Sequence, residues 1–233
     1  QDESDAGPAT RHWAYRPLAS VSIPSPADAG WCRNSIDVFV KSEQEARGLR
    51  PSRPARPETL LRRVYLDLTG LPPDAETLRV FLQDPSDEAY DRIVDELLAS
   101  PRYGERWGRH FMDIWRYSDY TGLGDDVHFG QRHIWHWREW IVESFNANKP
   151  YDRMILEMLA GDELAPTDAD TLRATGFLGR NQYRFNRNLW LEPIVEHTAK
   201  AFLGLTINCA KCHDHMYEPI TQEDYYRFRA FFE

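Results

Sequence analysis

Apolar residues recur along most of this chain at the three-to-four-residue spacing of an amphipathic helix. Tyr90, Ile93 and Leu97, for example, would share one helix face. The same pattern predicts helices over 35–48, 57–70, 74–82, 86–100, 103–117, 134–145, 150–161, 193–205 and 221–232. No stretch alternates apolar and polar residues convincingly, as a half-buried strand would. The pattern therefore predicts an all-α fold.

Residues that favour helix ends stand where several of these segments begin and stop. Asp74 and Ser86 are typical N-cap residues. Thr221, with Asp224 three residues later, is typical of a capping box. Gly70 closes its segment as a C-cap glycine would. These signals support the helix boundaries that the apolar pattern predicts.

Three segments lack the helical pattern. Residues 1–30 are rich in Pro, Ala, Ser and Asp, residues 121–130 are rich in Gly and Asp, and residues 162–190 read as irregular. We therefore expect an extended N-terminal arm over 1–30, followed by an irregular multi-helix domain over 31–233. The chain contains no internal repeat.

Composition narrows the classes of partner. The chain has 233 residues, of which 42% are hydrophobic and 28% charged, values that are ordinary for a soluble globular protein. The formal net charge of −9 disfavours nucleic acid and anionic membranes, and favours a cationic protein or a neutral small molecule. No apolar run approaches the length of a membrane span. The polar start at Gln1 resembles a mature end after signal removal, which favours export.

The pentapeptide Cys209-Ala210-Lys211-Cys212-His213 brings specific chemistry into the picture. C-x-x-C-H is the attachment signal of c-type haem. Two thiols one helical turn apart can add to the two vinyl groups of the porphyrin, and the adjacent His213 can bind the iron as its proximal ligand. We therefore predict one covalently attached haem c, held by Cys209, Cys212 and His213, around which the helical domain would wrap.

Two other interpretations of the motif stay open at this point. A thioredoxin-like redox pair belongs in a βαβ context, which the apolar pattern does not show. A zinc site could use Cys209, Cys212 and either His213 or His215. The only other cysteine, Cys32, lies far upstream, so a four-cysteine site is impossible.

Several stretches resemble the planctomycete-type cytochrome c domain, a bacterial family long catalogued as of unknown function. They are T-L-L-R-R at 59–63 with L-D-L-T-G-L-P-P at 66–73, S-P-R-Y-G-E-R-W at 100–107, and F-L-G-L-T at 202–206 running into C-A-K-C-H-D-H at 209–215. Shorter matches are P-Y-D at 150–152, A-G-D-E-L at 160–164 and D-Y-Y at 224–226. The resemblance extends from roughly residue 12 to the C-terminus.

The resemblance implies covalent haem and an exported, periplasmic location, but no settled reaction. Such domains usually sit in large proteins beside a further domain, which makes that domain or a separate redox protein the expected partner. The family commonly has a histidine at the position of His110. His197 and His136 depart from its pattern, and Cys32 looks particular to this chain.

The ligand on the other face of the iron is harder to predict. His215 and Met216 lie too close in sequence to His213 to reach that face, and packing or a propionate contact suits them better. His110 and His197 are the leading distal candidates, because each lies on a predicted helix whose periodicity could turn it towards the haem. The other candidates are His133, His136, Met112, Met154 and Met158, or an open position.

Charged clusters give a weaker signal. The arginines that could hold haem propionates by bidentate hydrogen bonds are Arg106, Arg109, Arg116, Arg180, Arg184 and Arg187. Solvated salt-bridged faces are the simpler interpretation. Asp125, Asp126 and His128 could bind a metal ion, although an exposed loop explains them equally simply.

Together these features predict a mono-haem c-type cytochrome domain that acts in electron transfer. A haem enzyme that oxidises a small molecule such as a sugar derivative is one alternative. A structural module stapled by haem or zinc is another.

Overall fold

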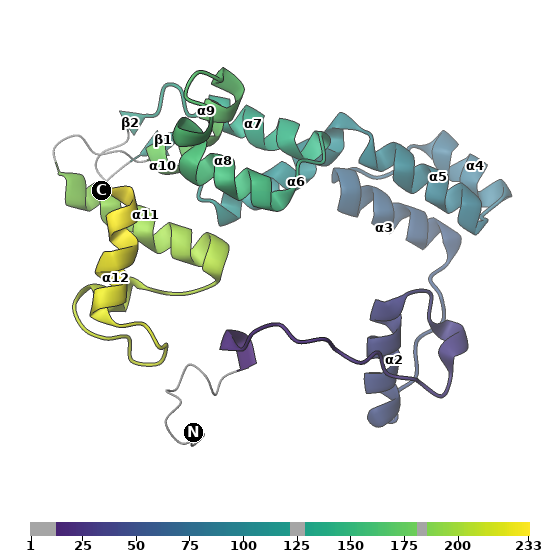
Figure 1. Ribbon diagram of the computed structural model, residues 1–233. Helices are drawn as coiled ribbons and strands as arrows, with labels where there is room; N and C mark the ends of the chain where they lie inside the picture. Colours follow the sequence, from purple (N-terminus) through teal and green to yellow (C-terminus); the bar gives the residue numbers. More distant parts are fainter. Residues whose placement is uncertain (1–12, 122–128, 181–185) are drawn as a thin grey trace, which may run out of the picture. The chain divides into compact units, whose positions relative to one another are not determined.

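The computed structural model of the protein describes residues 13–121, 129–180 and 186–233 (Figure 1). By its internal contacts the chain divides into two compact units, Gln1–Arg56 and Pro57–Glu233. The expected division into an arm over 1–30 and a domain over 31–233 stays a prediction.

From residue 13 onward, where the structure describes it, the first unit contains one α-helix and two short 3-10 turns. The turns are η2 (Trp13–Tyr15) and η3 (Ala29–Trp31), and the helix is α2 (Ser35–Ala46). The Asn34 side chain caps α2 by accepting a hydrogen bond from the backbone N–H of Asp37 at 3.0 Å. Most of the described chain before α2 is outside regular secondary structure and exposed.

The second unit is helical throughout most of its described length. Its elements are α3 (Pro57–Thr69), α4 (Ala75–Gln83), α5 (Asp87–Leu98), α6 (Pro101–Ile114), α7 (Trp135–Asn146), α8 (Tyr151–Leu164), α9 (Ala169–Ala174), α10 (Gly176–Gly179), α11 (Arg187–Thr198), the π-helical turn η4 (Ala199–Leu203), the 3-10 turn η5 (Asn208–Lys211), α12 (Gln222–Arg229) and η6 (Ala230–Phe232). Two-residue strands β1 (Tyr120–Thr121) and β2 (Phe129–Gly130) pair antiparallel, with Tyr120 opposite Gly130. The all-α prediction is therefore confirmed, apart from this short pair.

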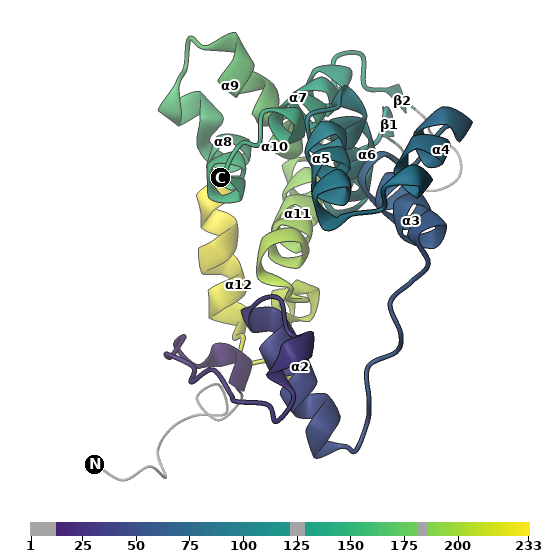
Figure 2. The ribbon, with the colours of Figure 1, turned by 90° about the vertical axis from the view of Figure 1, so that its right-hand side faces the viewer.

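Three buried clusters hold the second unit together. One lies among α3, α4 and α5, and the largest joins α6 to α10. The third is small and joins α11, η5 and α12. Figure 2 shows α12 running alongside α11. We call the α6–α10 cluster the packed region; it contains Met112, Trp115, Ile134, Trp137, Trp140, Ile141, Met154, Met158, Ala174 and Phe177. Among the described residues no helix is long and apolar enough to cross a membrane.

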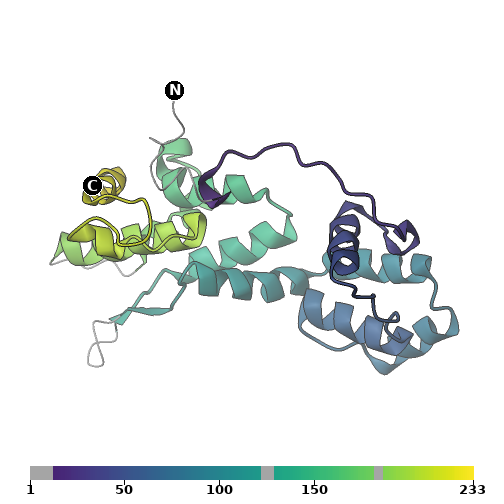
Figure 3. The same ribbon diagram turned by 90° about the horizontal axis from the view of Figure 1, so that it is seen from below.

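Two glycines allow α6 and α7 to pack closely side by side (Figure 3). A Cβ at Gly104 would lie 2.6 Å from the side-chain oxygen of Asn146, and one at Gly108 would lie 3.3 Å from the Val142 side chain. The Gly104 N–H donates to the same Asn146 oxygen at 2.8 Å. Because the glycine face of α6 is turned to α7, the opposite face, which carries His110, is left outside this contact.

Some predicted boundaries were wrong. Where the structure describes residues 162–190, they are mostly helical, because α8 continues to Leu164, α9 and α10 follow, and α11 begins at Arg187. Pro193 does not start a helix but lies inside α11, whose N-cap is Asn186. The Asn186 side chain accepts hydrogen bonds from the backbone N–H groups of Asn188 and Leu189, which have no partner within the helix. The helix therefore begins at this cap and not at the proline.

Candidate functional site

The C-x-x-C-H segment forms a short turn whose second residue, Ala210, is anchored in the core. Backbone N–H groups of Cys212 and His213 both donate to the carbonyl oxygen of Cys209, at 3.3 and 3.4 Å. Ala210 is fully buried in the cluster that includes Val195. Cys209, Cys212 and His213 are exposed. The turn therefore holds its two thiols and its imidazole on the surface.

The His213 ring is oriented by its own neighbour in the sequence. Its Nδ1 lies 2.7 Å from the carbonyl oxygen of Asp214. A carbonyl oxygen can only accept a hydrogen bond, so Nδ1 carries the proton in the neutral ring. Nε2 then bears a free lone pair, which is the form of imidazole that binds a metal.

His215 has the opposite arrangement, two residues further on. Its Nδ1 accepts hydrogen bonds from the backbone N–H groups of Tyr217, at 3.3 Å, and Glu218, at 2.9 Å. The proton of the neutral ring therefore lies on Nε2, which can donate but cannot bind a metal ion. His215 shapes the turn after the motif, and it is unsuited to be the histidine of a zinc site.

No group of three or more His, Cys, Asp and Glu side chains in the described ranges is arranged to hold a metal ion. A zinc site needs such a group, because all or nearly all of its donors come from the protein. Haem differs, because the porphyrin supplies four nitrogen donors and the protein needs to add only axial ligands and covalent links. Two accessible thiols beside an imidazole with a free Nε2 are the protein groups that a covalently attached haem c would use.

Hydrogen bonds to α12 and a salt bridge to α11 hold the motif in place. The Asp214 carboxylate accepts from the backbone N–H of Gln222 at 2.8 Å, near the start of α12. The carbonyl oxygen of Lys211 accepts from the Gln222 amide at 3.1 Å and from the Tyr226 hydroxyl at 3.2 Å. On the other side, Lys211 Nζ lies 2.6 Å from the Glu192 carboxylate of α11. The motif is thus tied to both helices of its small cluster.

Apolar side chains flank the motif in the sequence and are left exposed. Leu203, Met216 and Tyr217 are 57%, 75% and 85% exposed, respectively. A flat macrocycle attached at Cys209 and Cys212 would find apolar surface here.

The structure places the two leading distal candidates in contrasting settings. His110 is exposed on α6, where its ring makes an edge contact with Trp107 at 5.7 Å between centroids. His197 is buried on α11. Val195 packs in the cluster with Ala210, and His197, two residues later, points about 200° around the helix from it. Neither histidine is brought beside His213 by a described contact, so both assignments stay predictions.

The remaining candidates divide into core and surface. Met112, Met154 and Met158 are all buried in the packed region. His133 precedes α7, and His136 lies in its first turn, where its ring stacks on Trp135 at 3.7 Å between centroids. His12, His128, Asp125, Asp126 and Arg184 lie outside the described residues.

The arginines named from the sequence have different surroundings. Arg109 pairs with Asp113 on the surface of α6, and Arg187 donates to the carbonyl oxygen of Glu233. Arg180, in contrast, is only 2% exposed, and burial, with a smaller effect from the charge of Arg116, lowers its pKa to about 9. Burial also lowers the pKa of His197 to about 4, and the charges of Arg180 and Arg116 contribute. Sequence periodicity gave no sign of Arg180's burial, because the four-residue α10 is too short to show a pattern.

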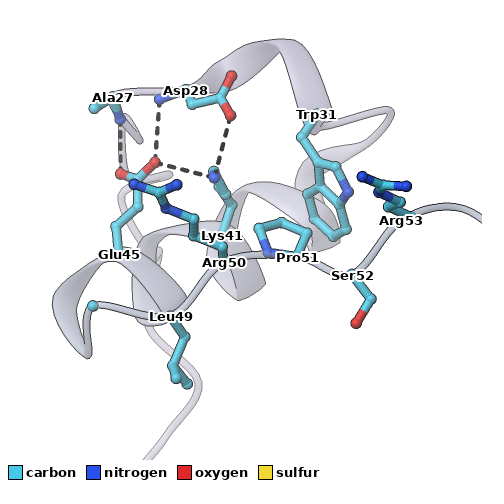
Figure 4. Close-up of a pocket in the computed structure, with 11 residues that line it drawn as sticks. Ala27, Asp28, Trp31, Lys41, Glu45, Leu49, Arg50, Pro51, Ser52 and Arg53 are labelled. Atoms are coloured by element: carbon cyan, nitrogen blue, oxygen red, sulfur yellow. Dashed lines mark hydrogen bonds and ion pairs between the residues drawn. The ribbon is translucent and has the colours of Figure 1, made fainter.

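The first unit has a pocket of about 830 Å³ that the sequence did not predict. Figure 4 shows Lys41 beneath it, between Asp28 at 3.3 Å and Glu45 at 3.6 Å. The Glu45 carboxylate also accepts from the backbone N–H groups of Ala27 and Asp28, and these bonds lower its pKa. The charged groups at the base of the pocket are therefore paired with one another and clip the extended chain to α2.

The fold and the motif define a helical domain with a surface-exposed C-x-x-C-H turn. A family model described as PSCyt2, protein of unknown function (DUF1549), matches residues 35–233. The chain belongs to this family. The resemblance to a planctomycete-type domain family of unknown function is thereby confirmed. No curated protein and no solved structure matches the chain.

Proposed function

We propose that this chain is a mono-haem c-type cytochrome domain that carries electrons within an exported, periplasmic protein. The observation that carries the proposal is the hydrogen bond from His213 Nδ1 to the Asp214 carbonyl, beside two exposed thiols. It leaves Nε2 free as a ligand at the position that C-x-x-C-H assigns to the proximal histidine. The family name PSCyt2 agrees with a cytochrome.

Each residue of the motif has a distinct part in this proposal. Cys209 and Cys212 supply the thiols for two thioether links, and His213 supplies the axial nitrogen. Ala210 fixes the turn in the core, so that the three reactive side chains stay on one exposed surface. Haem c, when bound, supplies a one-electron iron couple.

The partner we propose is a redox protein or a further domain of a larger protein. The net charge of −9 favours a cationic docking surface on that partner. The exposed apolar side chains of Leu203, Met216 and Tyr217 offer contact area around the motif. An exported location is part of the proposal, because C-x-x-C-H is read as a haem signal in exported proteins.

Covalent haem attachment is the decisive test. The full chain, expressed with the c-type maturation proteins, should give a c-type pyridine haemochrome and retain haem on a denaturing gel. Cys209→Ser and Cys212→Ser together should abolish both signals, since the thioether links need those thiols. Cys32→Ser is the matched control and should leave them unchanged. A colourless wild-type protein, or equal loss in the Cys32 variant, would contradict the proposal.

The histidines allow a second comparison. His213→Ala should lose the low-spin spectrum, because His213 has the free Nε2. His215→Ala should keep haem and spectrum, because its Nδ1 is occupied by two backbone donors. The same ferric spectrum separates electron transfer from catalysis. Low-spin iron that ignores added cyanide supports the carrier, whereas high-spin iron that binds it favours an enzyme acting on a small molecule such as a sugar derivative.

The distal ligand is tested with the same measurement. A change from low to high spin in His110→Ala, but not in His197→Ala, would assign the exposed histidine of α6. The reverse result would assign the buried histidine of α11. Retention of the low-spin spectrum in both variants would exclude both candidates.

A further inference from the structure

A buried guanidinium lies at the C-terminal end of α10, away from the cysteine motif in the sequence. Arg180 is 2% exposed, and its guanidinium carbon lies 4.0 Å from the centroid of the Phe177 ring. One nitrogen, Nη1, donates to the carbonyl oxygen of Phe177. The other two, Nε and Nη2, are buried and have no hydrogen-bond partner among the described residues. Buried donors without partners are rare in folded proteins, so this edge of the guanidinium needs an explanation.

The groups near Arg180 do not neutralise it. Its pKa is lowered by burial and by the positive charge of Arg116. The helix of His197 is joined to α10 by the hydrogen bond that Trp190 Nε1 donates to the carbonyl oxygen of Leu178 at 3.1 Å, and Phe202 of η4 packs on Phe177 at 5.1 Å between ring centroids. The charges of both arginines also lower the pKa of His197. Within the part of the chain that the structure describes, neither arginine forms an ion pair with a carboxylate. A buried charge left without a counter-charge is strongly destabilising, and proteins normally pair it.

Arg116 is held in an unusual backbone conformation. Its φ is +60°, a left-handed value that residues other than glycine and asparagine seldom adopt. The residue follows α6, and the next N–H, of Tyr117, donates back to the carbonyl oxygen of Met112 at 2.8 Å. Glycine is the usual residue at such a helix end. An arginine at this position therefore carries backbone strain that a glycine would avoid.

We propose that Arg180, Arg116 and His197 form a binding site for a carboxylate or a similar oxyanion. Nε and Nη2 are the two donors on one edge of the planar guanidinium, and that edge matches the two oxygens of a carboxylate in a bidentate pair. His197 Nδ1 is buried and also lacks a partner among the described residues, so it can add a third hydrogen bond. Arg116 is exposed and connects the cluster to solvent.

Two sources can supply this chemistry. One is a propionate of the covalently attached haem, and for that source the inference rests on the proposed function. The other is a free anion such as phosphate or a small carboxylic acid. The two sources share the bidentate contact with Arg180 and differ in whether the anion is part of the attached cofactor.

Binding of a free anion is tested by thermal unfolding of the full chain without haem, prepared by omitting the maturation proteins. Wild-type protein is compared with Arg180→Met and Arg180→Lys in sodium chloride, sodium acetate and sodium phosphate at equal ionic strength. The site predicts that acetate and phosphate raise Tm in the wild type with increasing concentration. Arg180→Met should lose this response, and Arg180→Lys should retain only part of it, because lysine keeps the charge but lacks the fork.

Arg79→Met is the matched control, since Arg79 is an exposed arginine paired with Glu76 on α4. It should respond to the anions like the wild type. In chloride alone, Arg180→Met should unfold at a temperature equal to or higher than that of the wild type, because removal of an unpaired buried charge relieves its cost. A purely structural Arg180 would instead give a lower Tm for Arg180→Met in every salt.

Binding of a haem propionate is tested by measuring the midpoint potential of the protein with haem attached. If a propionate occupies the site, added phosphate and acetate no longer raise the Tm of the wild type. Arg180→Met then lowers the midpoint potential, because a positive charge near the haem favours the reduced state. Arg79→Met leaves the potential unchanged. If haem is attached but Arg180→Met changes neither the anion dependence of Tm nor the midpoint potential, this inference is overturned and the proposed function stands. If no haem is attached but acetate and phosphate raise Tm only when Arg180 is present, the proposed function is overturned and the anion site stands.

Discussion

The packed region around α6–α10 and the segment that carries the cysteine motif are built by different means. The packed region buries ten residues in one cluster, including three tryptophans. The motif segment, which we define as residues 204–221, buries only Ile207 and Ala210. Its shape depends on hydrogen bonds to Asp214, Lys211 and His215. Apolar packing therefore determines where the helices lie, whereas individual polar contacts determine how the motif is presented.

The largest expected effect comes from closing the gap between α6 and α7. Gly104→Ala places a Cβ 2.6 Å from the Asn146 oxygen and closer still to the carbonyl oxygen of Val142. We expect a loss of about 3 kcal/mol in the free energy of unfolding, because backbone must move to relieve the contact. Urea unfolding followed by tryptophan fluorescence measures it.

Gly179→Ala is the control for this substitution. Gly179 also lies in a helix, α10, but a Cβ there would meet nothing within 4 Å. Alanine is the better helix former, so this change should be neutral or stabilising by up to about 1 kcal/mol. Equal losses in the two variants would show that α6 and α7 are not packed as closely as the glycines indicate.

A smaller effect is expected at the buried carboxylate of α8. Burial alone would raise the pKa of Glu157, but its ion pairs with Lys149 at 2.6 Å and Arg153 at 2.7 Å outweigh burial and lower it. A lowered pKa in the folded state means that the group stabilises the fold above its ordinary pKa of about 4.5. That stabilisation is lost as the pH falls through the folded-state pKa.

Glu157→Gln should therefore cost about 2 kcal/mol near neutral pH, because it breaks a buried, doubly bonded ion pair. The difference from the wild type should shrink as the pH falls below about 4.5. Urea unfolding at several pH values measures both effects. Glu223→Gln, which removes an exposed ion pair with Arg227, is the control and should change stability by a few tenths of a kcal/mol. A pH-independent cost at Glu157 would mean that its charge is not stabilising.

The smallest effect is expected in the motif segment itself. Asp214→Asn weakens the hydrogen bond to the N–H of Gln222 at the start of α12. We expect a loss of at most about 1 kcal/mol in global stability, comparable with the loss of a helix cap. Local opening should increase more clearly, as faster amide hydrogen exchange of residue 222. Asp168→Asn, which weakens the cap of α9, is a control that should leave exchange at residue 222 unchanged. No change at residue 222 in Asp214→Asn would show that this bond does not hold the motif.

Where a helix boundary depends on a local cap, the sequence predicted it well. Asp74, Ser86 and Thr221 all accept the hydrogen bonds expected of N-caps, and Thr221 and Asp224 complete the predicted capping box. The start of α11 also depends on a local cap, but that cap was not recognised in the sequence. Proline is tolerated seven residues into that helix, and the residue that caps it, Asn186, lies in a stretch without apolar periodicity.

The chemical site was only partly predictable. The two thiols and His213 were identified as candidates from a contiguous motif, but the sequence did not predict the short turn that carries them. The protonation of His213 and His215 depends on which backbone groups the turn brings to each ring, and no spacing rule contains that information. The burial of Arg180 and His197 depends on contacts among short or distant elements. The distal ligand stays a prediction for the same reason.

The two positions between the cysteines, 210 and 211, should differ in how many residue types they accept. Ala210 fills a closed space against α11 and α12, and any larger side chain would push the turn away from them. Lys211 reaches outward to Glu192 across a partly exposed ion pair, so its exchange for another polar residue disturbs little. In a library randomised at both positions, only small residues should survive at 210, while 211 should accept many. The motif is therefore better written C-small-x-C-H in this protein, since packing within the folded domain restricts the residue at position 210.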